Sequence, residues 1–253
     1  MRINGSVIGS TVTPGLVTGA TGFWNLQNVD IANRSRSWPT DIITNGIILF
    51  LDANNTNSYP GSGTAWYDLS GYGNTGTLTN GPTFSAGNQG SIVFDGTNDY
   101  VPIGTSGFPF GSSAGTLSVW AKTNTISSGY IWIVSYGTAL GSQSRFLGIN
   151  SSTYLFGGYG DDINASGVPL NTWFNMVGVY DGTNAFLYIN GNLVSGPTAK
   201  SWNTIANNAQ LGRQTNGGEY WNGNISQVQV YNRALTATEV LQNFQLMRTR
   251  FGV

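Results

Sequence analysis

The sequence predicts an all-β fold: an antiparallel sandwich or jelly roll with a short C-terminal helix and an extended N-terminal arm. Three observations predict it. From residue 46 onward, short apolar or alternating segments are separated by turn signals about every 8–12 residues. No strand–helix–strand rhythm of a parallel sheet interrupts them. Near the end, Thr236 stands three residues before Glu239, which is the capping box that begins a helix.

The elements follow in chain order. Residues 46–53 form a nearly continuous apolar run, which predicts a strand buried on both sides. Asn190-Gly191 between two apolar runs predicts a tight hairpin, because both residues tolerate positive φ. In the C-terminal helix Val240, Phe244 and Met247 share one face, expected to pack on the sandwich or on the arm. Further strands are expected within 91–103, 115–123, 130–137, 145–150, 154–160, 173–194, 208–213 and 225–231.

Composition excludes several function classes. Charged residues make up 8% of the chain, against about 25% in ordinary domains, and the net charge is −1. Such a chain has no field to attract nucleic acid or an anionic membrane, and no run of about 18 apolar residues predicts a membrane span. The chain has no cysteine or histidine, so it has no disulfide, thiol nucleophile or Ser-His-acid triad. No signal peptide is apparent at the N-terminus.

Residues 1–40 differ in composition from residues 41–253 and predict a separate docking arm. Trp24 and Trp38 would anchor it and Arg34 and Arg36 would form ion pairs, since Trp and Arg dominate interface hot spots. The alternative is a tail folded onto its own sandwich.

The segments "GSIVFDGTNDYV", "GTLSVWAK", "TWFNMVGVYDGTNAFLYINGNLV" and "GNISQVQVYNRALTATEV" resemble laminin-G-like, concanavalin-A-like jelly rolls. The resemblance spans about Ile47 to Phe244. It implies surface recognition, often of glycans, or a purely structural sandwich, and some members bind calcium on a loop edge. Many members carry paired acidic residues where this chain has Ser226-Gln227, which puts a cation site at that position in doubt. The segment "GFWNLQNVDIANRSRSWP" looks like short segments of tailed-phage virion proteins, particularly of marine and cyanobacterial phages.

The acidic residues offer little for catalysis. Enzymes with this jelly roll cleave glycans with two carboxylates, and the retaining glucanase type places Glu and Asp close together on one strand. With Glu219 and Glu239 as the only glutamates, that motif cannot be built, and Glu239 is better explained as a capping residue. An Asp-only pair stays open, but we expect no enzymatic activity. Weak candidates for a hard-cation site, with calcium as the one cofactor left open, are Asp95, Asp99, Asp161 and Asp162. The alternative is that these carboxylates bind turn amides.

Aromatic residues in loops rich in Gly, Asn and Ser are candidates for ligand binding. A sugar ring needs an aromatic platform for its apolar face, and amides or hydroxyls for its hydroxyl groups. The candidates are Trp132, Tyr136, Tyr154, Tyr159, Trp202, Tyr220 and Trp221. The alternative is that these large side chains fill the sandwich.

Together these features predict a non-enzymatic phage virion surface protein, a tail-fibre or capsid-decoration module made in the host cytoplasm. Its arm would contact other virion proteins and its jelly roll would face outward, as a trimer if it forms a fibre. The alternative is a lectin-like adhesin that binds host or environmental polysaccharide. A hydrolase fragment is a third hypothesis, which would need glycan cleavage lost on substitution of Asp161 or Asp162.

Overall fold

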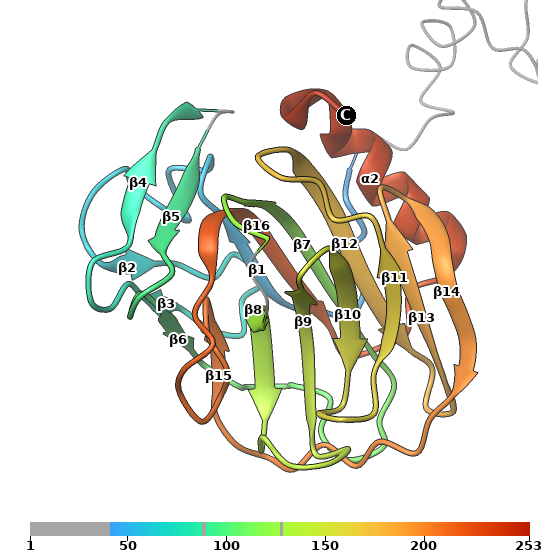
Figure 1. The fold of residues 1–253 in the computed structure, drawn as a ribbon. Coiled ribbons are helices and arrows are strands. Elements are labelled where there is room, and N and C mark those ends of the chain that lie inside the picture. The colour runs from blue at the N-terminus through green and yellow to red at the C-terminus, as the bar shows by residue number, and fades with distance from the viewer. Residues whose placement is uncertain (1–40, 88–89, 127–128) are drawn as a thin grey trace, which may run out of the picture. The chain divides into compact units, whose positions relative to one another are not determined.

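The structure, a computed structural model, describes residues 41–87, 90–126 and 129–253. It confirms the predicted antiparallel β-sandwich with a C-terminal helix (Figure 1). The arm residues Trp24, Arg34, Arg36 and Trp38 lie outside the described residues. The elements are β1 (Ile47–Asp52), β2 (Ala65–Trp66), β3 (Gly76–Thr77), β4 (Thr83–Ser85), β5 (Ser91–Asp95), β6 (Val101–Ile103), β7 (Gly115–Thr123), β8 (Tyr130–Gly137), β9 (Ser144–Asn150), β10 (Thr153–Gly157), β11 (Ile163–Ser166), β12 (Trp173–Tyr180), β13 (Asn184–Ile189), β14 (Asn192–Ala199), β15 (Ala209–Leu211), β16 (Asn222–Tyr231) and α2 (Ala237–Phe251).

Two sheets make the sandwich. The eight-stranded sheet runs β14-β13-β12-β7-β16-β5-β4, with β1 also paired to β16. The six-stranded sheet runs β11-β10-β9-β8-β15-β6 and lies in front of the other in Figure 1. Because β16 is ten residues long, β5 and β1 follow one another along it, paired through Asn222–Ile225 and Gln227–Tyr231 respectively.

The main core fills the space between the sheets. Leu147 and Ile149 of β9 belong to it, as do Phe174 and Met176 of β12, and all four are almost fully buried. The sheets approach closely where Gly178 of β12 faces Phe156 of β10, because a Cβ at Gly178 would overlap the Phe156 ring. A glycine is therefore needed there to let the ring fill the core.

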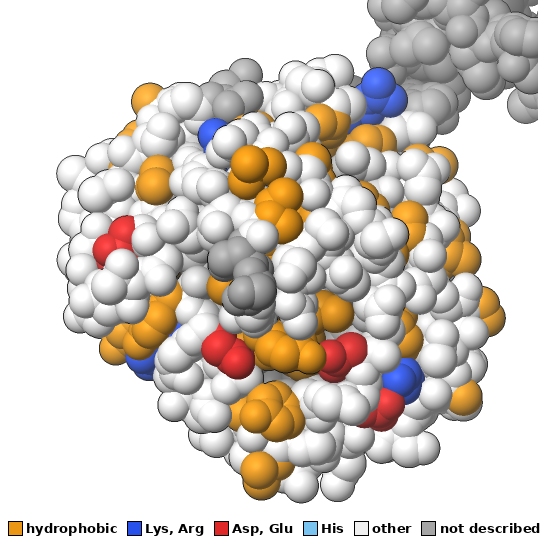
Figure 2. Space-filling view, viewed as in Figure 1, with side chains coloured by type: hydrophobic (Ala, Val, Ile, Leu, Met, Phe, Trp, Pro, Cys, Tyr) orange, Lys and Arg blue, Asp and Glu red, His pale blue; other side chains and the backbone are white. Residues whose placement is uncertain are grey.

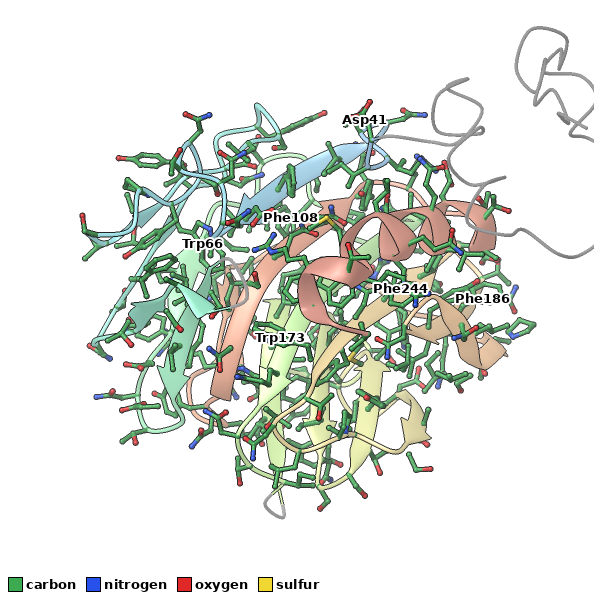
Figure 3. The ribbon with its side chains drawn as sticks, turned by 90° about the horizontal axis from the view of Figure 1, so that it is seen from above. Asp41, Trp66, Phe108, Trp173, Phe186 and Phe244 are labelled. Atoms are coloured by element: carbon green, nitrogen blue, oxygen red, sulfur yellow. The ribbon has the colours of Figure 1, made fainter. Side chains whose placement is uncertain are left out.

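Helix α2 covers the outer face of the eight-stranded sheet. Trp120 of β7 stacks on Phe251 and Phe244 of α2, with ring centroids 4.2 and 5.8 Å apart. Figure 3 shows Phe244 and Trp173 in this layer. The predicted apolar helix face therefore packs on the sandwich. At fifteen residues, α2 is too short to cross a bilayer, and the described part of the chain has no other helix that could.

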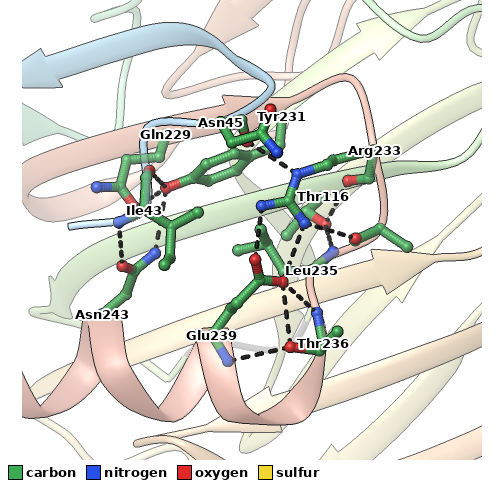
Figure 4. Close-up of polar contacts among 11 residues, drawn as sticks. Ile43, Asn45, Thr116, Gln229, Tyr231, Arg233, Leu235, Thr236, Glu239 and Asn243 are labelled. Carbon is green, nitrogen blue, oxygen red and sulfur yellow. Dashed lines mark hydrogen bonds and ion pairs between the residues drawn. The ribbon is translucent and has the colours of Figure 1, made fainter. Parts of the chain in front are cut away.

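The predicted capping box begins α2 as expected. The Thr236 hydroxyl accepts from the Glu239 amide, and the Glu239 carboxylate accepts from the Thr236 amide (Figure 4). Arg233 adds an ion pair to Glu239 with an Nη2–Oε1 distance of 2.7 Å. The Arg233 hydrogen bonds are the largest cause that lowers the pKa of Glu239 to about 2.

The other end of α2 is tied to the sandwich by a buried ion pair. Arg250 Nη1 lies 2.9 Å from Asp52 Oδ1 and 3.0 Å from Oδ2. Ser226 accepts from Arg250 and Gln227 donates to Asp52. Ser226 and Gln227, at the position where the sequence put a cation site in doubt, thus hold a structural ion pair.

Candidate functional site

A second apolar cluster lies on the outer face of the six-stranded sheet. Strand residues alternate between faces, and Leu147 of β9 points into the main core. Its neighbour Phe146 therefore points outward, where it packs with Trp132 of β8 and Leu155 of β10. The face that α2 leaves uncovered thus has its own aromatic layer.

Trp132 of this layer also lines a pocket of about 210 Å³. Figure 2 shows apolar side chains between two acidic groups on this face of the molecule. Drug-sized ligands occupy pockets of roughly 300–1,000 Å³, so this cavity suits a single small ring. The lining residues are Tyr130, Trp132, Tyr159, Gly160, Asp162, Gln214 and Glu219.

Aromatic rings from two elements make the walls. Tyr130 and Trp132 are two apart on β8 and therefore share a face, and their rings stack at 6.1 Å with an interplanar angle of 12°. Tyr159 comes from the loop after β10 and is 38% exposed. Its φ of 55° is in the left-handed region, which costs a non-glycine residue about 1 kcal/mol. The pocket therefore offers apolar ring faces to a ligand.

Polar groups of the pocket converge from two loops. Glu219, also left-handed with φ of 52°, accepts a hydrogen bond at Oε2 from Trp132 Nε1. Gln214 is 6% exposed, and within the described residues its side-chain amide makes no hydrogen bond. An amide that no protein group satisfies is available to a polar group of a ligand.

Asp162 is the second carboxylate of the pocket. Its Oδ1 is buried without a hydrogen-bond partner among the described residues, and it lies against Gly157. Burial raises the pKa of Asp162 to about 6, Lys200 acts against that shift, and the charge of Asp161 adds to it. The carboxyl group therefore changes charge close to neutral pH.

Only some of the aromatic residues predicted to bind a ligand line this pocket. Trp132 and Tyr159 line the pocket, whereas Tyr220 is partly exposed and lies outside its lining. Trp202 is 1% exposed and lines a separate cavity of about 380 Å³ with Tyr180 and Lys200.

The other three predicted aromatics are core residues. Tyr136, Tyr154 and Trp221 are at most 3% exposed and pack between the sheets. Tyr136, for example, meets Phe108 edge-on at 5.1 Å. The expectation that these three face a ligand therefore does not hold, because they have no surface to offer.

The predicted cation ligands have other partners. Asp95 accepts from the Thr97 and Asn98 amides, and Asp99 accepts from the Asp95 amide. Asp161 forms an ion pair with Lys200, with an Nζ–Oδ1 distance of 2.6 Å. Nowhere in the described ranges do three acidic side chains gather as metal ligands would. The alternative explanation, that Asp95 and Asp99 stabilise their own turn, is the one the structure supports.

Sequence reasoning missed three side chains of this pocket, Tyr130, Gln214 and Glu219, in addition to Gly160. Tyr130 could have been found, because it lies two residues before Trp132 on a predicted strand. Gln214 and Glu219 gave no such signal, since only the folded loop between β15 and β16 brings them to β8.

Comparison with known proteins agrees with the architecture. Residues 95–241, more than half of the chain, match the concanavalin A-like lectin/glucanases superfamily. No curated protein matches.

Three solved structures share the fold at low sequence identity. Domain 4 of an extracellular arabinanase from Geobacillus stearothermophilus, in complex with arabinotriose, has a TM-score of 0.62 at 18% identity, covering 79% of this chain and 98% of that one. The botulinum neurotoxin serotype G binding domain has a TM-score of 0.64 at 17% identity, with coverages of 80% and 51%. A mutant of Trypanosoma rangeli sialidase displaying trans-sialidase activity has a TM-score of 0.63 at 15% identity, with coverages of 90% and 39%. The chain thus spans about half of the neurotoxin domain and about two fifths of the sialidase. On the family match and this fold, the chain belongs to the concanavalin A-like lectin/glucanase superfamily.

Proposed function

We propose that this domain binds carbohydrate in the pocket on the outer face of the six-stranded sheet. One observation carries the proposal: the rings of Tyr130, Trp132 and Tyr159 enclose a cavity of about 210 Å³ together with an amide and two carboxylates. A sugar has an apolar face of C–H groups and a rim of hydroxyl groups. The rings would cover the former, and Gln214 and the carboxylates would hydrogen-bond the latter.

Similar proteins support this proposal. The family includes lectins by name, and the arabinanase domain of the same fold was solved with a bound trisaccharide. A neurotoxin domain of this fold is a binding domain. These are properties of those proteins, and they make glycan binding the first function to test in this one.

The test compares single-tyrosine variants by calorimetry, with an oligosaccharide chosen from a glycan array. Tyr130→Ala and Tyr159→Ala each remove a pocket wall worth about 1–1.5 kcal/mol, so affinity should fall about tenfold. Tyr67→Ala is the matched control, because Tyr67 is 48% exposed and lies outside the pocket lining. Equal losses in all three variants, or unchanged affinity in the pocket variants, would show that the ligand binds elsewhere.

Absence of catalysis stays a prediction, since the family also includes glucanases. The structure brings together a pair that sequence reasoning did not consider, Asp162 and Glu219. We expect the bound oligosaccharide to remain intact in an assay for new reducing ends. Release of reducing ends that disappears in Asp162→Asn would instead establish a hydrolase.

The virion location also stays a proposal, and it rests on residues 1–40 of the sequence. As part of it, we propose that this segment docks the protein to a phage particle through Trp24, Arg34, Arg36 and Trp38. Particles stripped of the protein should rebind the full chain but not a chain that starts at residue 41. Equal rebinding of both chains would refute docking by the segment.

A further inference from the structure

The carbohydrate pocket has charge of one sign only. Asp162 and Glu219 both line it, and no Lys or Arg does. The whole chain carries 11 acidic and 10 basic residues, so two carboxylates at one small cavity are a local excess. Two carboxylates that line one small cavity attract a cation and repel an anion, so a cationic occupant is favoured over a neutral or anionic one.

Neighbouring cations do not supply that counter-charge. Lys200 acts electrostatically on Asp162, but its Nζ forms the 2.6 Å ion pair with Asp161 and donates to the Asp162 backbone carbonyl oxygen. Arg213, next to Gln214 in sequence, stacks its guanidinium on the Tyr100 ring at 3.3 Å and donates to Gln210. The Asp162 carboxylate keeps one buried oxygen without a partner in the described structure.

The rest of the pocket suits a cation attached to a sugar ring. Aromatic faces attract cations as well as C–H groups, and Tyr130, Trp132 and Tyr159 line the same pocket as the two carboxylates. The Gln214 amide, which makes no hydrogen bond within the described residues, can bind a polar group of the ligand beyond the charge. A bare metal ion would use neither the rings nor the amide nitrogen.

We propose that the pocket selects a sugar bearing a protonated amino group, as in the D-glucosamine units of a deacetylated amino-polysaccharide. The ammonium would lie between Asp162 and Glu219, with the sugar ring against Tyr159 or Trp132. This inference rests on the proposed function and names the ligand class of the same site.

Calorimetry with three tetrasaccharides tests the inference: β-1,4-linked glucosamine, its N-acetylated form and the corresponding glucose polymer. All titrations include a chelator. The amine should bind at least about tenfold more tightly than either neutral sugar, because a charged hydrogen bond contributes about 1.5–3 kcal/mol. Equal or tighter binding of the neutral sugars would overturn the inference. Amine binding that appears only when calcium replaces the chelator would also overturn it, because the carboxylates would then hold a metal ion.

Two variants test whether the charge of Glu219 selects the amine. Glu219→Gln should weaken amine binding about tenfold and neutral-sugar binding much less, since Gln keeps an oxygen that can accept from Trp132 or a sugar hydroxyl but loses the charge. Asp95→Asn is the matched control, because Asp95 is exposed, lies outside the pocket and holds its turn through an oxygen that Asn also has. A similar loss in both variants would overturn the inference by showing an effect of net charge alone. If Tyr159→Ala weakens all three sugars while Glu219→Gln changes none, glycan binding stands and amine selection fails. If none of the three sugars binds, both glycan binding and amine selection are refuted.

Dependence on pH gives a second readout. The carboxyl of Asp162, with its pKa raised to about 6, is ionised above that pH and neutral below it; Asp161, Lys200 and Glu219 are the charged groups around it. The amine of the ligand also gains protons over this range, and it does so equally with wild type and with Asp162→Asn. The ratio of wild-type to Asp162→Asn amine affinity should therefore fall severalfold from about pH 7 to about pH 5. An identical pH profile in Asp162→Asn would refute the placement of the amine at Asp162.

Discussion

The buried ion pair between Asp52 and Arg250 holds the end of helix α2, so its loss should be among the most damaging single changes. The side chains of Arg250 and Asp52 are only 7% and 11% exposed. Asp52→Asn keeps the shape but removes the charge that balances Arg250. Breaking one partner of a buried pair costs about 3–5 kcal/mol, because the remaining charge stays buried without compensation. At about 2–4 °C per kcal/mol for a domain of this size, 3 kcal/mol corresponds to about 6–12 °C in melting temperature.

Urea unfolding followed by tryptophan fluorescence measures this loss, and a double-mutant cycle assigns it. Arg250→Met should cost much less in the Asp52→Asn background than in the wild type, because the unbalanced charge is gone. A loss below about 1 kcal/mol for Asp52→Asn, the magnitude of an exposed pair, would refute the reasoning that the pair is buried and strong.

Four further predictions concern the core, the helix start and the pocket. Gly178→Ala should lower the free energy of unfolding by about 1–3 kcal/mol in urea titrations, because the new methyl group overlaps Phe156. Thr236→Ala should cost about 1 kcal/mol in the same assay through loss of the helix cap. Because the pKa of Glu239 is lowered to about 2, its ionised form stabilises the fold at neutral pH, and that contribution is lost as pH falls from about 4.5 to 2; Glu239→Gln should lack this loss in acid titrations. Gly157→Ala should weaken sugar binding, measured by calorimetry, because a Cβ there displaces the Asp162 carboxyl.

Controls separate these effects from general damage. Gly160 of the pocket loop is left-handed with φ of 73°, and a methyl group there would meet open space, so Gly160→Ala reports backbone strain without displacing Asp162. Equal sugar affinity in Gly157→Ala and wild type would contradict the assigned position of Asp162. A Gly178→Ala variant as stable as wild type would contradict the close approach of the sheets.

Much of the fold could be predicted because its signals are local. Strand β8, predicted at 130–137, is found at Tyr130–Gly137, and the Thr236 capping box begins α2 as expected. Strand β11 was not predicted, because Ile163–Ser166 lies in a polar, Gly- and Asp-containing segment whose composition predicts a loop. It becomes a strand only by pairing with β10.

The site was harder to predict because it depends on contacts distant in sequence. Trp132 and Tyr136 are four residues apart on β8 and would share a face of a regular strand. A bulge between Trp132 and Val134 changes the alternation, so Trp132 points outward and Tyr136 points into the core. Asp161 and Asp162 are adjacent in sequence but have different surroundings. Asp161 forms an ion pair with Lys200, whereas Asp162 lines the pocket. Their partners come from loops that only the folded sandwich brings together.

A crystal structure of the protein with the β-1,4-linked glucosamine tetrasaccharide tests the central claim most directly, because it locates the ligand. We expect one sugar ring in the pocket of Tyr130, Trp132 and Tyr159, with its nitrogen between the carboxylates of Asp162 and Glu219. Sugar density confined to the separate cavity beside Tyr180, Lys200 and Trp202 would contradict the account.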